Sequence, residues 1–126
     1  MLKTLFLTGF TTILVTLPAA AENWVLVGIG QGEIQHYIDT ESVRSSNGSF
    51  LLWRMSVLPK SDEKGILATK SYIYMICPLR AWQRRAYAHF NAQGKLLSRE
   101  ELGENQPLQF FTSGSVGEGL WKFVCD

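Results

Sequence analysis

Two cysteines constrain the fold of this chain more than any other feature of its sequence. Cys77 lies within residues 70–82, KSYIYMICPLRAW, the longest β-like run after the N-terminal region, and Cys125 lies one residue before the end of the chain. A bond between them would restrict the unfolded chain by about 4 kcal/mol. The alternative is two reduced, buried thiols. We favour the bond because chain ends fray unless something anchors them.

The N-terminal region predicts an export signal. Lys3 precedes a mostly apolar run at residues 5–17, and the small residues at 18–21 predict cleavage after Ala21. The apolar run is shorter than the roughly 20 residues that a membrane-spanning helix needs. We therefore expect residues 22–126 to form one exported domain without a membrane span, in a compartment that permits disulfides.

The charge of the chain disfavours nucleic acid as a partner. The chain has 12 basic residues, of which Lys3 lies in the predicted signal, and 11 acidic residues. Residues 22–126 are therefore formally neutral, whereas binding to a phosphate backbone draws on a basic excess.

Short alternating segments separated by turn residues predict an α+β fold with a single antiparallel sheet of about six strands. The expected strands are residues 23–29, 33–39, 50–58, 68–77, 84–90 and 95–99.

The C-terminal residues 115–125 predict a helix instead. Its apolar residues recur at helical spacing, and Ser115 can cap its start. If Cys125 bonds to Cys77, the helix packs on the sheet face that carries Ile73 and Met75. Small residues at Ala86 and Ala88 would leave room for the helix on the next strand.

No catalytic or metal-binding pattern appears in the sequence. The two histidines, His36 and His89, are far apart, and no HxH, ExxH or GxSxG pattern is present. The glycines of GIGQG at residues 28–32 lack the third glycine of a dinucleotide fingerprint. We therefore predict no enzymatic activity, no cofactor and no metal site.

The sheet face opposite the helix is the candidate partner-binding face. Tyrosine and arginine are enriched where proteins bind one another. By alternation this face is expected to carry Arg54, Tyr72, Tyr74, Arg85, Tyr87 and His89. An ordinary outer sheet face is the alternative, because aromatic residues also favour strands for packing reasons alone.

Landmarks along residues 22–126 resemble the bacterial surface-adhesin protein E family. They are Trp24, Tyr37-Ile38-Asp39 followed by Ser42-Val43, Trp53, Lys70 and Tyr72 before Cys77, Tyr87 before Gly94, and Ser115 before the helix that ends at Cys125. The resemblance implies a six-stranded antiparallel sheet with a C-terminal helix held by the disulfide.

In function, the resemblance implies an adhesin that binds host matrix or serum proteins, such as vitronectin and laminin, and that can form a homodimer. The sequence departs from the family by lacking a lipid-attachment cysteine after the signal and a lysine-rich tail after Cys125. Periplasmic, cell-surface and secreted locations all stay open. A periplasmic small-ligand-binding or accessory protein of the same fold is the alternative function.

Overall fold

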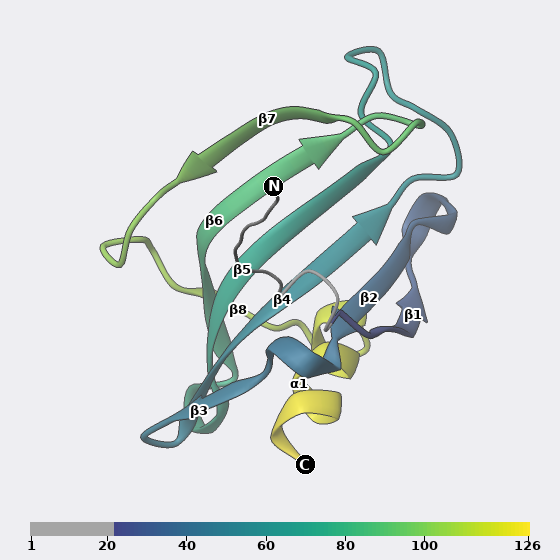
Figure 1. The fold of residues 1–126 in the computed structure, drawn as a ribbon. Coiled ribbons are helices and arrows are strands. Elements are labelled where there is room, and N and C mark those ends of the chain that lie inside the picture. The colour runs from purple at the N-terminus through teal and green to yellow at the C-terminus, as the bar shows by residue number, and fades with distance from the viewer. Residues whose placement is uncertain (1–21) are drawn as a thin grey trace, which may run out of the picture.

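The computed structural model describes residues 22–126, and the predicted signal peptide at residues 1–21 lies outside them. The described residues form one antiparallel sheet with an α-helix packed on one face (Figure 1). The predicted fold class is confirmed, but the sheet has eight strands rather than about six. The elements are β1 (Trp24–Ile29), η3 (Gln31–Glu33), β2 (Gln35–Asp39), η4 (Thr40–Ser42), β3 (Arg44–Ser46), β4 (Ser49–Val57), β5 (Ala68–Ile76), η5 (Cys77–Leu79), β6 (Ala81–Phe90), β7 (Leu96–Glu101), β8 (Gln109–Phe110) and α1 (Val116–Cys125).

The two strands that the sequence did not predict are short. The main path of the sheet runs β1-β2-β4-β5-β6-β7, while β3 pairs with β4 and β8 pairs with β6. At three residues and two residues, β3 and β8 are too short to show an alternating pattern. Both extend the sheet at one end of a longer strand.

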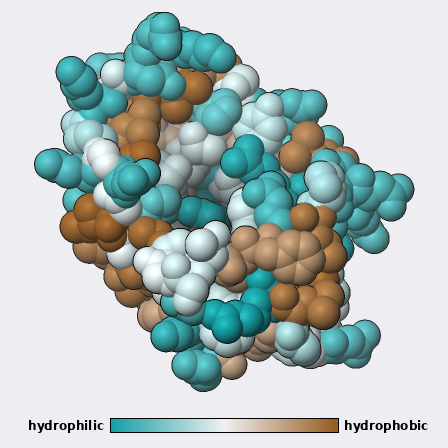
Figure 2. Space-filling model, turned by 180° about the vertical axis from the view of Figure 1, so that it is seen from behind, coloured by the Kyte–Doolittle hydropathy of each residue, from teal (hydrophilic) through white to brown (hydrophobic). Residues whose placement is uncertain are grey.

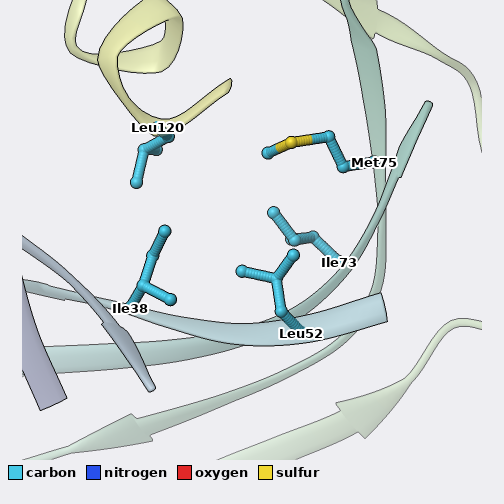
Figure 3. Close-up of a cluster of buried hydrophobic side chains, with 5 residues drawn as sticks. All are labelled: Ile38, Leu52, Ile73, Met75 and Leu120. Carbon is cyan, nitrogen blue, oxygen red and sulfur yellow. The ribbon is translucent and has the colours of Figure 1, made fainter. Parts of the chain in front are cut away.

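The core lies between the helix and one face of the sheet. Leu120 of α1 points at Ile38, Leu52, Ile73 and Met75, and all five side chains are almost completely buried (Figure 3). Burying a side chain of this size contributes about 1.5–3 kcal/mol. This small cluster therefore fixes which face of the sheet the helix covers.

Further contacts hold the helix along its length. The predicted disulfide between Cys77 and Cys125 is present, with the two Cα atoms 5.9 Å apart. Trp121 Nε1 donates a hydrogen bond of 3.0 Å to the carbonyl of Cys77. At the other end, Glu118 pairs with Arg80, and Ser115 Oγ accepts from the amide of Glu118 at 3.2 Å, as predicted for the cap.

A β-bulge at Arg85 changes which residues of β6 face the helix. Tyr72 pairs with Ala86, but Ile73 pairs with Arg84, so Arg85 is an extra residue on β6. Because successive side chains point to opposite faces, the extra residue reverses the alternation beyond it.

The expectation that Ala86 and Ala88 lie under the helix is therefore wrong. Their pairing partners on β5 are Tyr72 and Lys70, whose side chains lie on the face opposite the buried Ile73. The bulge is the physical reason, since the prediction assumed unbroken alternation along this strand.

The two glycines of the helix provide a matched test of its packing. A Cβ at Gly117 would lie 2.6 Å from the Phe111 ring, whereas a Cβ at Gly119 would meet nothing within 4 Å. We expect Gly119→Ala to raise the free energy of unfolding by up to about 1 kcal/mol, from helix propensity alone. Gly117→Ala should lower it because Phe111 must move. Denaturant titration measures both, and equal effects would contradict the packing.

Candidate functional site

The face opposite the helix, here called the outer face, carries stacked aromatic and cationic side chains. Across the sheet, Tyr72 and Tyr74 of β5 point to this face, and the guanidinium of Arg85 lies 4.3 Å from the centre of the Tyr74 ring. Trp53 lies beside Tyr72, with ring centres 5.1 Å apart. Stacks of this kind stabilise a rigid, partly exposed surface.

Lys70 lies at the centre of a second group on the outer face. Its Nζ atom is 5.3 Å from the centre of the Trp24 ring, 5.0 Å from that of Phe90, and 3.7 Å from Glu22 Oε2. Lys70 also helps to line a hollow of about 250 Å³, together with Trp53, Phe90 and Leu96. The outer face therefore combines aromatic surface with ordered positive charge.

The structure brings only half of the predicted partner-binding face together. Tyr72, Tyr74 and Arg85 share the outer face, whereas the other three predicted residues lie on the helix side: Arg54, Tyr87 and His89.

This separation has two causes. Arg54 lies two residues after the buried Leu52, so it shares the helix side with it. Tyr87 and His89 follow the bulge at Arg85, which reverses their direction. Their partners across the ladder are Ser71, which is buried, and Thr69.

The three displaced residues belong to a second group, here called the polar basin: His36, Arg54, Thr69, Ser71, Arg84, Tyr87 and His89. Figure 2 shows this side of the molecule, where the surface is hollowed near its middle and hydrophilic side chains lie in the hollow. The helix covers the apolar part of this face, and the polar basin occupies the rest.

Hydrogen bonds order the polar basin. Arg54 Nη2 donates to His36 Nδ1 at 2.8 Å, and a guanidinium can only donate, so this ring nitrogen accepts and carries no proton. A hydrogen bond of 2.8 Å joins Thr69 Oγ1 and His89 Nδ1. Tyr87 donates to Glu100 Oε1 at 2.7 Å, which raises the pKa of its phenol because the bond requires the proton.

Two adjacent arginines thus stack on tyrosines of opposite faces. Arg84 lies 5.2 Å from the ring centre of Tyr87 on the helix side, while Arg85 lies over Tyr74 on the outer face. Each face therefore carries one arginine–tyrosine stack. Substitution of its two residues removes one stack and leaves the other in place.

A groove of about 690 Å³ opens beside the start of the helix. Its lining includes Ile29, Gly30, Gln31, Ile34, His36, Gly114, Ser115, Val116 and Gly117. Among the described residues, no cluster of three or more potential metal-ligating side chains occurs. No helix in this part of the chain is long and apolar enough to span a membrane.

The fold defines a class of small α+β domain in which an open antiparallel sheet carries one disulfide-anchored helix. The chain belongs to the Surface-adhesin protein E family, whose model matches residues 24–126. It is similar in fold to the solved structure of Haemophilus influenzae protein E, with a TM-score of 0.55 and 14% sequence identity. The match covers 81% of this chain and 83% of that chain. No curated protein sequence matches the chain.

Several residues that lie on the two faces were not predicted from the sequence. Lys70 and Trp53 lie on the outer face. Alternation could have placed them there, because Lys70 lies two residues before Tyr72 and Trp53 lies two residues before Met55, which is also on this face. His36 lies in the polar basin, where it accepts a hydrogen bond from Arg54. No sequence signal showed that Tyr87 and His89 would face away from Arg85.

His36 gives the stability a defined pH dependence. Burial, and then the charge of Arg54, lower the pKa of His36 below its ordinary value of 6.5. As the pH falls through 6.5, the unfolded chain therefore binds a proton that the native state resists, and stability is lost. We expect His36→Gln, which keeps an acceptor for Arg54, to remove part of the decrease in unfolding free energy between pH 7.5 and 5.5. Identical pH slopes in denaturant titrations of both proteins would contradict this account.

Proposed function

We propose that this protein is an exported, non-enzymatic adhesin that binds a host matrix or serum protein through its outer face. Membership of the surface-adhesin family supports adhesion as the activity. The observation that carries the choice of face is the Arg85 stack on Tyr74, next to the paired rings of Trp53 and Tyr72. Trp, Tyr and Arg are the residues that most often dominate binding energy at protein interfaces.

The charge of the outer face suggests the chemistry of the partner. Lys70 and Arg85 are both held over aromatic rings of the outer face. Lys70 already pairs with Glu22, whereas Arg85 has no acidic partner within residues 22–126. An acidic or aromatic segment of a partner would complement this surface. We also propose that the protein is exported, so that the mature protein is periplasmic, on the cell surface or secreted. We further propose that it can form a homodimer.

The two arginine–tyrosine stacks provide the test. We expect the double variant Tyr74→Ala/Arg85→Ala to weaken binding to immobilised matrix or serum proteins by about tenfold or more, measured by surface plasmon resonance. The matched variant Tyr87→Ala/Arg84→Ala, which removes the stack on the other face, should bind like the unaltered protein.

Circular dichroism of each variant establishes that the fold is intact. Binding that survives loss of the outer stack but not of the inner one would move the interface to the helix side. A failure of the unaltered protein to bind any tested host protein would reject host adhesion.

A second candidate function is the binding of a small ligand, favoured by the groove of about 690 Å³ beside the start of the helix. Pockets for small ligands have volumes of this order. A ligand of this groove would contact Ser115 and His36, and its binding would raise the melting temperature further as its concentration increases above the dissociation constant.

A further inference from the structure

The polar basin holds two arginine side chains on the helix side of the sheet, Arg54 and Arg84. The pairing of β4, β5 and β6 places Arg54 and Arg84 in neighbouring rows of side chains on this face. Arg54 lies over Trp82 at 5.9 Å from the ring centre, next to the hydrophobic core. A guanidinium in this position is largely withdrawn from water.

Neither arginine is neutralised by an acidic side chain within residues 22–126. The ion pairs of this region join other residues, namely Lys70 with Glu22, Arg80 with Glu118 and Arg99 with Glu101. Glu100 pairs with Tyr87 across β6 and β7 and lies on this face at the sheet margin, where its carboxylate accepts the hydrogen bond of Tyr87 rather than pairing with an arginine. The floor of the polar basin therefore carries an excess of positive charge.

The effect of this excess is visible in Arg54 itself. Burial, followed by the charge of Arg84, lowers the pKa of Arg54 to about 10. Two guanidinium groups that share a poorly solvated site repel each other, and the repulsion is relieved by an anion bound between them.

Donors for such an anion remain free. Arg54 uses one N–H for His36, and a guanidinium has five N–H donors. In the described part of the chain, no fully buried side-chain nitrogen or oxygen lacks a hydrogen-bond partner. The remaining guanidinium nitrogens of Arg54 are therefore not buried without a partner, and they are available to an anion.

We propose that the polar basin is a binding site for a small oxyanion, such as a phosphate or carboxylate group, held by Arg54 and Arg84. The planar N–H forks of arginine match the paired oxygens of these groups. His36 fixes the orientation of Arg54 from the other side. This inference does not rest on the proposed adhesin function, because it concerns the opposite face of the sheet.

The test is a titration with inorganic phosphate, at constant ionic strength and neutral pH, followed by the NMR signals of the arginine Nε–H groups. We expect the signals of Arg54 and Arg84 to shift and to saturate, while those of Arg85 and Arg99 do not. A parallel titration with succinate separates the two chemistries. Saturation by either anion supports the site and names its preference, and saturation by neither rejects it.

Matched variants separate a specific site from a general salt effect. Arg84→Gln should weaken the apparent phosphate affinity by about tenfold or more, since a hydrogen bond to a charged group is lost. Arg85→Gln, the adjacent residue on the outer face, should leave the affinity unchanged. Arg84→Gln is the deciding variant because Arg54 packs against the core. Equal titration of both variants, or equal shifts at all arginines, would overturn the proposal.

Discussion

The docking of α1 on the sheet is the interaction on which the rest of this structure depends. A helix of ten residues that includes two glycines is not stable alone in water. Its position is fixed by the buried Leu120, by the disulfide from Cys125 to Cys77, and by the pairing of Glu118 with Arg80. Because these contacts lie at the apolar end of one face, the rest of that face is left open, and the polar basin lies there.

The bulge at Arg85 then decides on which face of the sheet Tyr87 and His89 lie. Without it, Arg85, Tyr87 and His89 would point the same way, and Arg84 would lie on the opposite face with Ala86 and Ala88. With it, Arg85 joins Tyr74 on the outer face, while Arg84 and Tyr87 join Arg54 on the helix side. One extra residue therefore gives the sheet two different polar surfaces, for which we propose two different ligands.

Much of the fold could be predicted from the sequence, but less of the site. Six strands, the helix and the Cys77–Cys125 bond follow from alternation, helical spacing and the count of cysteines. The short strands β3 and β8 lack enough residues to show a period. The partner-binding face was divided because alternation carries no sign of a bulge: nothing in the residues 84–87, RRAY, shows that Tyr87 points away from the face of Arg85. Whether the outer face binds a partner stays a prediction.

The most direct measurement is the set of nuclear Overhauser effects between the arginine side chains of β6 and the tyrosine rings. The bulged strand predicts contacts from Arg85 to Tyr74 and from Arg84 to Tyr87, because these guanidiniums lie 4.3 Å and 5.2 Å from the respective ring centres. Contacts from Arg85 to Tyr87 would show an unbroken strand. In that case the division between the outer face and the polar basin, and the two ligand proposals built on it, would be wrong.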